Sequence, residues 1–351
     1  MRTLILAAGR FGDATRKAIA EGREPRLDVF ELADKLQADV IDFLDVDKSS
    51  NLGVKLAAKL AGPSAGVAQL GFLGRRHYDA MLTTGEDIGL PLAMLLKASR
   101  ARVSHTMIAH TLFPAKKRVF FKAGVASNLD RVLAYSTSEE RLMIDELRIP
   151  AERVERIYYH ADQRFFRPAE QLPLPNTICA AGQLLRDYDC LIEAVRDLPV
   201  KLQIAAGSPW IDKSLQPVGA LPENVTWGKL GRYELRSLYE RSALAVVPIL
   251  QNHYQTGIAT ILEMMAMGKC VIATRTLGQT DTIVDGVTGV YVPPSDPAAL
   301  RAAIQTLLAD PERAASMGRA ARKFIEQSAG LDLFVERLVT AVRAGHALRF
   351  G

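Results

Sequence analysis

Short apolar runs alternate with longer, alanine- and leucine-rich stretches along most of this sequence, and the alternation limits the folds that the chain can adopt. The runs are often β-branched and predict strands, whereas the stretches between them, such as 53–60 and 90–99, have helical spacing. This pattern is typical of a mostly parallel sheet covered by helices on both faces. In the first half, the predicted strands are residues 3–8, 28–32, 40–44, 81–84, 103–109 and 132–136.

A proline-rich segment interrupts the alternation near the middle of the chain. Pro168, Pro173 and Pro175 lie close together, and proline disfavours helix interiors and central strands. We therefore predict domains over 1–168 and 169–330, and a C-terminal helix over 331–351 that could pack back on the first domain. Domains that face each other would share a cleft at the carboxyl ends of their strands, where ligands bind. The predicted strands of the second half are 177–181, 202–206, 225–227, 243–248, 270–274 and 290–292.

The composition excludes several classes of protein. A chain with 48% apolar and 24% charged residues is an ordinary globular one, and its net charge of +5 is too small to identify a partner. Cys179, Cys190 and Cys270 form neither a disulfide framework nor a C-x-x-C site, so we expect them in the core, in a reducing compartment. The sequence has no signal-peptide body and no apolar stretch long enough for a membrane span. We therefore expect a cytoplasmic chain that does not enter a membrane by itself.

Glu263 stands out in the second half, because it is the only acidic residue between Arg241 and Thr280 and its neighbours in a predicted helix are apolar. Burying a carboxylate is unfavourable unless other groups hydrogen-bond to it. Glu263 therefore either holds a loop by hydrogen bonds among other polar groups or belongs to a functional site. Thr256 and Gly257 open this helix, and a helix N-terminus suits a phosphate or pyrophosphate. Glu263, two turns further on, would then lie near a ribose.

At this point the residues resemble the retaining glycosyltransferases of family 4, which have the GT-B fold. In that family the region reads Glu-x7-Glu followed by Ala-Met-Ala-x-Gly-x-Pro-Val, and here it reads Gln255-x7-Glu263-Met-Met-Ala-Met-Gly-Lys-Cys-Val. Segments 224–228 and 285–297 also match. The resemblance covers residues 177–326 and, more weakly, the first half. It implies an α/β fold of two Rossmann-like, doubly wound parallel-sheet domains facing a cleft.

The resemblance also implies roles for individual residues of the second half. Glu263 is expected to bind the donor ribose, and the segment after Gln255 to bind sugar and phosphate through its backbone. The family has a Glu at the position of Gln255, and an amide cannot offer its negative charge. Arg186 most nearly matches a pyrophosphate-binding Lys, although a surface ion pair with Asp187 or Asp189 is the alternative. The implied donor-binding residues are Gly9, Gly12, Gln183, Arg186, Lys229, Leu230, Gln255, Thr256, Gly257, Ile258, Ala259 and Glu263, of which Arg186 and Gln255 are also catalytic candidates.

The candidates of the first half follow predicted strands. Gly9 and Gly12 lack the G-x-G-x-x-G spacing of a dinucleotide fold, and a plain strand-to-helix turn is the alternative to a phosphate-side loop. Glu86 and Asp87 follow the strand at 81–84 as either ordinary helix-start residues or acceptor-side groups. The family often carries a His after the strand that matches 103–109, near the transferred sugar. His110 is therefore the third catalytic candidate.

The excess positive charge of the first half is concentrated in residues 88–129, which contain no Asp or Glu. A helix over 116–122, from Lys116 to Lys122, mixes basic and aromatic side chains. Such a helix can lie on an anionic membrane, and several family 4 enzymes dock on membranes through their N-terminal domains. The alternative is a solvated helix whose Phe120 and Phe121 pack inward. Peripheral contact with the inner face of the membrane therefore stays an option.

The resemblance predicts a glycosyltransferase that moves a sugar from a UDP- or GDP-type nucleotide sugar to a glycan, lipid-linked or small-molecule acceptor. It implies retention of anomeric configuration, no required metal and no other cofactor. The alternatives are a nucleotide-sugar epimerase with the GT-B fold and a non-catalytic GT-B subunit, the latter motivated by Gln255 and Gln183. We expect no nucleic-acid partner, because no recognition module is present.

Overall fold

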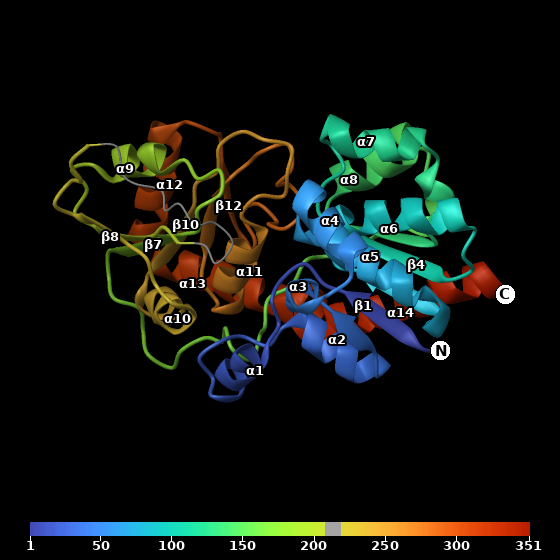
Figure 1. Ribbon diagram of the computed structural model, residues 1–351. Helices are drawn as coiled ribbons and strands as arrows, with labels where there is room; N and C mark the ends of the chain where they lie inside the picture. Colours follow the sequence, from blue (N-terminus) through green and yellow to red (C-terminus); the bar gives the residue numbers. More distant parts are fainter. Residues whose placement is uncertain (208–218) are drawn as a thin grey trace. The chain divides into compact units, whose positions relative to one another are not determined.

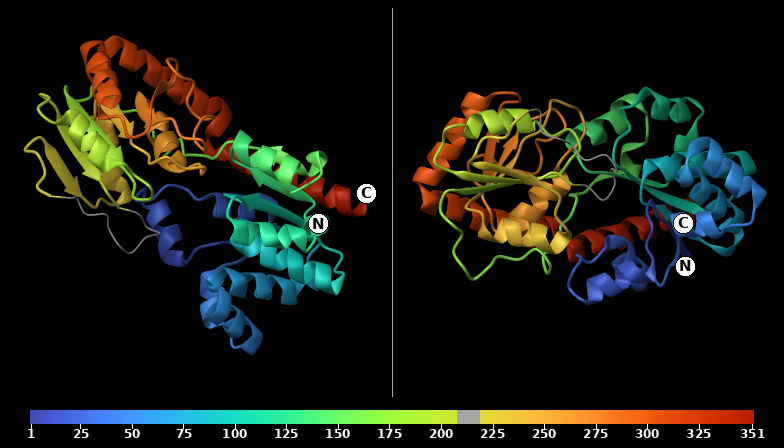
Figure 2. Two further views of the ribbon diagram at one scale, coloured as in Figure 1. Left: turned by 90° about the horizontal axis from the view of Figure 1, so that it is seen from above. Right: turned by 60° about the vertical axis from the view of Figure 1, so that its left-hand side comes forward.

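The computed structural model describes residues 1–207 and 219–351 (Figure 1). The chain divides into two compact units. Unit 1 consists of Met1–Ala20, Arg26–Ile157 and Phe334–Gly351, and unit 2 of Glu21–Pro25 and Tyr158–Leu333. Each unit contains one six-stranded, all-parallel sheet with helices on both faces, which Figure 2 shows from two further sides. The predicted pair of parallel α/β sheets is confirmed.

The sheet of unit 1 has the strand order β2-β1-β3-β4-β5-β6. Helices α5 and α6 cover one face, and residues of α14 pack on the other, where a Cβ at Gly345 would lie 3.0 Å from Thr106 Oγ1. The strands are β1 (Thr3–Leu6), β2 (Asp39–Ile41), β3 (Ala80–Thr83), β4 (Ser104–Ala109), β5 (Arg131–Ala134) and β6 (Val154–Arg156). The helices are α1 (Asp13–Ala20), α2 (Asp28–Leu36), α3 (Phe43–Lys48), α4 (Leu52–Ala61), α5 (Pro63–Gly74), α6 (Glu86–Ser99), α7 (Ala115–Lys122), α8 (Thr137–Arg141) and most of α14 (Leu331–Phe350).

The sheet of unit 2 has the order β12-β11-β10-β7-β8-β9. From β7 the chain continues to β8 and β9 on one side, then returns to β10 on the other side. Helices α10 and α11 cover one face, and α9 and α12 cover the other. The strands are β7 (Thr177–Ala181), β8 (Lys201–Ala205), β9 (Val225–Gly228), β10 (Leu244–Val247), β11 (Val271–Thr274) and β12 (Gly289–Val292). The helices are α9 (Tyr188–Val195), α10 (Arg232–Arg241), α11 (Ile258–Ala266), α12 (Pro297–Ala309) and α13 (Pro311–Phe324).

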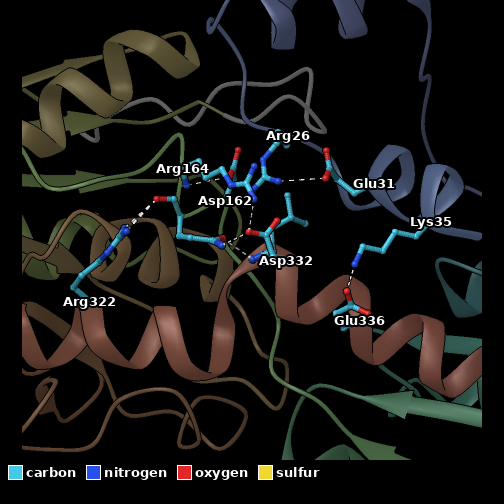
Figure 3. Close-up of polar contacts among 10 residues, drawn as sticks. Arg26, Glu31, Lys35, Asp162, Arg164, Arg322, Asp332 and Glu336 are labelled. Carbon is cyan, nitrogen blue, oxygen red and sulfur yellow. Dashed lines mark hydrogen bonds and ion pairs between the residues drawn. The ribbon is translucent and has the colours of Figure 1, made fainter.

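The segment around Gln163 belongs to unit 2, ahead of the predicted boundary at residue 168. Phe165 and Phe166 pack into the core of unit 2, which explains why the division falls at Ile157. The side chain of Gln163 accepts a hydrogen bond from Leu331 N and donates one to Asp332. Arg164 also pairs with Asp332, whereas Lys35 pairs with Glu336 within unit 1 (Figure 3).

One predicted strand is wrong. Residues 28–32 begin helix α2, which buries Val29, Phe30, Leu32 and Ala33. These positions are three and four residues apart, as on one face of a helix, but within five residues a helical and a strand pattern look alike. Strand β6, a three-residue strand at the edge of the sheet of unit 1, was not predicted. Each predicted strand of the second half overlaps an observed one.

Candidate functional site

The order of strands in unit 2 marks a site at the carboxyl ends of β7 and β10. These two strands are neighbours, and the chain leaves them in opposite directions along the sheet. In open parallel sheets, ligands bind at such a topological switch point, because the loops that follow the two strands turn away from each other. Here the two loops are 182–187 after β7 and 248–257 after β10, and the second loop leads into α11.

Arg186 is buried between these two loops. Its Nε donates to Ala181 O at 3.0 Å, its Nη1 to Leu184 O at 2.9 Å, and its Nη2 to Thr260 Oγ1 at 3.3 Å. Among the residues that the structure describes, no carboxylate forms an ion pair with Arg186, so the predicted alternative of a surface pair with Asp187 or Asp189 is wrong. Asp187 caps α9 instead. Burial lowers the pKa of Arg186, and the distant Glu263 charge only partly opposes this.

Two glycines keep side chains away from the Arg186 guanidinium. Gly182 has a φ of +98°, and a Cβ there would lie on the guanidinium. Gly257 has a φ of +81° and precedes the first turn of α11, where a Cβ would lie 3.3 Å from Arg186 Nη1. Left-handed backbone favours glycine at both positions. The arrangement places a buried cation beside a helix N-terminus, and both favour an anion.

The loop before α11 is held by Gln279, which is completely buried. Gln279 Nε2 donates to Thr256 O at 3.3 Å, and its Oε1 accepts from Thr282 Oγ1 at 3.0 Å. The buried Thr256 donates its hydroxyl to Asn252 Oδ1 at 3.1 Å. Next to Gln279, a Cβ at Gly278 would lie 2.2 Å from Tyr254 O, so the segment after β11 is in close contact with the loop at 248–257. These bonds fix the backbone that leads to Gly257.

Glu263 is buried in α11, behind the helix N-terminus. Its Oε1 accepts from Arg232 Nη1 at 2.9 Å, and its Oε2 accepts from Tyr239 Oη at 3.3 Å. Both partners belong to α10. Burial raises the pKa of Glu263, although Arg232 and the Tyr239 hydroxyl act in the opposite direction. The carboxylate therefore has the hydrogen-bond partners that its burial demands, and each oxygen keeps a second lone pair for another donor.

The other predicted residues of unit 2 surround these loops. Gln183 is buried directly after Gly182, whereas Gln255, Ile258 and Ala259 are half-buried around Gly257. Lys229 is exposed after β9, and its aliphatic stem covers Gly207 at the end of β8. Leu230 packs against the core, and Trp227 packs edge-on against Tyr188, as expected for a core side chain. The switch point thus brings Arg186, Thr256 and Gly257 together, with Glu263 deeper in the same helix.

In unit 1, the turn after β1 contains Gly9 and Gly12. Asp42 holds it, because the Asp42 carboxylate accepts from Phe11 N at 2.6 Å and also caps α3. A Cβ at Gly9 would lie 2.6 Å from the Phe11 ring. Neither glycine has a positive φ. Asp42 therefore fixes this turn, and a role of Gly9 and Gly12 beside a phosphate stays a prediction.

Glu86 and His110 lie together at the carboxyl ends of β3 and β4. Glu86 is buried at the start of α6 and accepts from His110 N at 2.8 Å and from Thr111 N at 3.3 Å. The His110 ring is exposed, and its Nε2 lies 2.9 Å from Thr84 O. Asp87 is largely exposed. Glu86 is thus an anchor for the loop at 110–112, whereas the His110 ring and Asp87 are accessible.

Lys117 is buried against this anchor rather than exposed on a basic surface. Its Nζ lies 2.5 Å from Glu86 Oε1 and 3.1 Å from Asp87 Oδ1. Burial lowers the pKa of Lys117, but the two carboxylates outweigh that effect and raise it. Arg118 pairs with Glu146, and Phe120 and Phe121 pack against the core. The helix α7 therefore matches the predicted alternative with inward phenylalanines, and Lys117 is not available to a membrane.

Sequence reasoning missed several residues that build these sites. Arg232 was not singled out, and neither was Glu139, whose Oε2 accepts from Leu112 N at 3.1 Å in unit 1. Burial raises the pKa of Glu139 to about 7. The isolation of Glu263 in sequence indicated that it needs a partner, but no local pattern identified Arg232.

No group of three or more His, Cys, Asp or Glu side chains within 1–207 and 219–351 is placed to hold a metal ion. In the same part of the chain, no helix is both long and apolar enough to span a bilayer.

Comparison with known proteins gives a match in unit 2 that includes the switch point. Residues 175–310, which include both loops of the switch point, match the family model described as glycosyl transferases group 1. A GDP-mannose-dependent alpha-(1-6)-phosphatidylinositol monomannoside mannosyltransferase of Mycolicibacterium smegmatis is 48% identical over 162 residues, 42% of this chain and 42% of the relative. A glycogen synthase of Mycobacterium tuberculosis is 35% identical over 27% of this chain and 22% of its own length. The chain thus spans less than half the length of these relatives.

Solved structures match nearly the whole chain. Anabaena HepE in complex with UDP and glucose has a TM-score of 0.69 and 14% identity, covering 98% of this chain and 99% of HepE. A sucrose-phosphate synthase from Thermosynechococcus elongatus has a TM-score of 0.72 and 17% identity, with 98% of each chain covered. The chain has the GT-B fold. In this fold two Rossmann-like domains follow each other in the chain, which agrees with the two parallel sheets of units 1 and 2.

Proposed function

We propose that this GT-B chain is a glycosyltransferase that uses a UDP- or GDP-type nucleotide sugar as donor and retains the anomeric configuration. The carrying observation is Arg186, a buried guanidinium without a carboxylate partner among the described residues, at the switch point of unit 2 and beside the N-terminus of α11. A buried cation needs an anion. The match of residues 175–310 to group 1 glycosyltransferases supports a nucleotide diphosphate in that role.

The donor pyrophosphate would contact Arg186 and the free N–H groups at the start of α11. Because Gly182 and Gly257 carry no Cβ, the ligand can approach the backbone closely. When the sugar leaves, negative charge develops on the pyrophosphate. Donors that are already in place stabilise this charge without reorganising, which is commonly the largest single contribution to catalysis.

The donor ribose would bind to Glu263. Each carboxylate oxygen accepts one hydrogen bond from Arg232 or Tyr239 and can accept another from a ribose hydroxyl. We expect Glu263→Ala to weaken donor binding measurably in titration calorimetry. Unchanged donor affinity would overturn the ribose assignment.

The first test of the donor site is a thermal-shift screen against UDP-, GDP- and ADP-sugars, because a ligand that binds only the folded chain raises its melting temperature. One nucleotide series should stabilise the wild type. For that series, Arg186→Gln should weaken binding by about tenfold or more, because hydrogen bonds between charged groups contribute about 1.5–3 kcal/mol. Arg186→Lys, which keeps the charge, should lose less of the affinity for the nucleotide.

The matched control is Arg275→Gln, which removes an exposed arginine of unit 2 that is paired with Asp285. It should bind the nucleotide like the wild type. If Arg186→Gln and Arg275→Gln bind the same nucleotide equally, Arg186 does not bind the donor and the proposal fails.

The acceptor would be a hydroxyl-bearing glycan, lipid or small molecule bound by unit 1, where the His110 ring is accessible. Similar proteins are named as transferases for phosphatidylinositol monomannoside and for D-inositol 3-phosphate, which is compatible with this range of acceptors. His110→Ala should lower the rate of transfer and leave donor affinity unchanged. Retention is tested by NMR analysis of the product anomer.

A non-catalytic GT-B subunit is the second candidate, because Gln255 and Gln183 are neutral where family 4 enzymes carry charged side chains. Absence of both donor hydrolysis and transfer, with nucleotide binding retained, would favour it. An epimerised nucleotide sugar formed without acceptor would favour an epimerase instead.

A further inference from the structure

A hollow of about 410 Å³ lies in unit 1 at the amino ends of its strands. We call it the basic hollow, and its lining residues are Met1, Lys35, Leu36, Arg343 and His346. Met1 precedes β1 and Leu36 precedes β2, whereas Glu86 and His110 follow the carboxyl ends of β3 and β4. Because the strands are parallel, these groups lie at opposite edges of the sheet. The basic hollow is therefore separate from the candidate site of unit 1.

Three basic side chains of the basic hollow come from two helices that are distant in sequence. Lys35 lies in the last turn of α2, and Arg343 and His346 lie three residues apart on one face of α14. No Asp or Glu lines the hollow, and residues 337–351 contain none. Among the residues that the structure describes, no carboxylate pairs with Arg343 or His346. In contrast, Arg349 of the same helix pairs with Asp130.

The helix dipole does not account for all of these basic residues. A positive charge near the C-terminus of a helix is favourable, but the effect falls off within the last turn. It accounts for Lys35 in the last turn of α2. Helix α14 ends at Phe350, so Arg343 and His346 lie before its last turn. Cations that face one hollow repel one another, and an anion between them is therefore favourable.

A carboxylate also approaches these groups from α14. Glu336, two turns before Arg343, pairs with Lys35, as Figure 3 shows. The Lys35 and Glu336 side chains are 46% and 55% exposed, so water screens the pair and it is weak. The ammonium group of Lys35 has three N–H donors, and the pair uses one of them. Lys35 can therefore donate to a second anion without leaving Glu336.

We propose that the basic hollow binds a phosphate monoester of a small molecule. The planar Arg343 guanidinium offers parallel N–H donors, which match two oxygens of one phosphate. The His346 imidazole and the Lys35 ammonium supply further donors. The hollow has room for more than a phosphate, and Met1 and Leu36 provide apolar walls for the carbon atoms of the ester. Such a ligand would bridge α2 and α14 and hold the C-terminal helix on unit 1.

Binding is tested through the melting temperature of the tag-free protein at constant ionic strength. Glycerol 3-phosphate should raise the melting temperature and glycerol should not, because a ligand that binds only the folded chain stabilises it. Arg343→Gln with His346→Gln should weaken the affinity for glycerol 3-phosphate by about tenfold or more, because hydrogen bonds to a charged group are lost. The matched control is Arg76→Gln with His77→Gln, which removes an exposed arginine and histidine of unit 1 outside the hollow.

Two further measurements locate the bound phosphate. Arg186→Gln, which removes the proposed phosphate-binding group of unit 2, should keep the response to glycerol 3-phosphate. The outcome is therefore independent of the proposed donor site. In NMR spectra, the imidazole signals of His346 should shift when glycerol 3-phosphate is added, and those of His77 should not. The chain has six histidines, so single substitutions can assign these signals.

Several results would overturn the proposal. One is a wild type whose melting temperature does not respond to glycerol 3-phosphate. Another is an Arg343 and His346 variant that binds this ester as tightly as the Arg76 and His77 variant does. If Arg186→Gln alone abolishes the response, the phosphate binds at the donor site instead. If the protein binds vesicles that contain phosphatidic acid but not glycerol 3-phosphate, the phosphate belongs to a lipid and the small-molecule ligand is wrong.

The Arg343 and His346 variant should fold normally, because both side chains line an open hollow and Arg343 is exposed. Its circular dichroism spectrum and its melting temperature without ligand should match those of the Arg76 and His77 variant. A loss of the response to glycerol 3-phosphate in such a folded variant then reports on binding alone.

Discussion

The Glu263 carboxylate depends on residues that are distant in sequence. Arg232 and Tyr239 from α10 hydrogen-bond to its two oxygens, and Arg186 adds a favourable charge from the neighbouring loop. Burial nevertheless raises the pKa of Glu263. A carboxylate in this state is stable only as part of the group, because a buried charge that loses its partner keeps its desolvation penalty.

Arg232→Met should therefore destabilise the protein by about 3 kcal/mol or more, because it leaves Glu263 buried without its ion pair. Glu263→Met should also destabilise it. The double variant should recover much of the combined loss, because a pair of well-packed apolar side chains replaces a buried ion pair at little net cost. Urea unfolding followed by tryptophan fluorescence measures the three variants. Strictly additive losses would show that the two residues do not act as a pair.

The sequence predicted that Glu263 needs hydrogen-bond partners, but it could not identify them. Arg232 lies 31 residues before Glu263, and the two approach each other only because α10 and α11 cover the same face of the sheet. Arg186 was predicted as a phosphate-binding residue from resemblance alone. Its carbonyl partners Ala181 and Leu184 are local, but its contact with Thr260 requires β7 and β10 to be neighbours, which no local pattern encodes.

At the level of elements, two buried carboxylates hold the loop between β4 and α7. Glu86, at the start of α6, binds the backbone of His110 and Thr111, and Glu139, in α8, binds the backbone of Leu112. The groups that act on the Glu139 carboxyl are Thr111, Leu112, Glu86 and Lys117. Because His110 belongs to this loop, the two carboxylates determine where its ring lies.

Glu139 should make the stability of unit 1 depend on pH. Burial raises its pKa from 4.5 to about 7, so the folded chain binds a proton that the unfolded chain has released. Its contribution is most favourable below pH 4.5 and declines as the pH rises to about 7. The decline amounts to about 3 kcal/mol. Glu139→Gln, which stays neutral, should match the wild type near pH 4.5 and be more stable above pH 7.

Scanning calorimetry across this pH range compares Glu139→Gln with the wild type. The control is Glu140→Gln, the next residue of α8, which is half-exposed and 3.8 Å from Arg156. An unfolding temperature of Glu139→Gln that follows the wild type at every pH would show that Glu139 does not bind the extra proton.

The strands of unit 2 were predictable because they are short, apolar and β-branched between clear helices. The helical structure of 28–32 was not predictable, because its buried residues form a short run that fits both the helical and the strand period. Only the full length of α2 distinguishes the two. The edge strand β6 contains the polar pair Glu155 and Arg156, so its sequence has no apolar run.

On the scale of the molecule, the last helix of the structure belongs to both units. Helix α14 starts at Leu331 in unit 2, but from Phe334 to the end it belongs to unit 1. Phe334 packs near Tyr135, Gly345 lies against Ser104 and Thr106, and Arg349 pairs with the buried Asp130 at 3.0 Å. The C-terminal residues therefore cover one face of the N-terminal sheet.

A chain that ends at residue 333 should keep unit 2 folded and lose the compact structure of unit 1, because the face of β4 and β5 next to α14 becomes exposed. Limited proteolysis with mass spectrometry should then find cleavage within 26–157 and protection within 219–333. A chain without its last two residues is the control and should resist cleavage throughout. Equal protection of both units in the shorter chain would contradict this role for α14.

The position of α14 also has a consequence for synthesis. Residues 26–157 are synthesised before unit 2, but the helix that completes their unit is translated only after unit 2. Domains usually fold in the order in which they are made. Here the second unit can finish folding before the first, and the nascent chain must carry an uncovered N-terminal sheet until α14 has been made. Chaperones that bind apolar surface on nascent chains would therefore be expected to act on the first half of this protein.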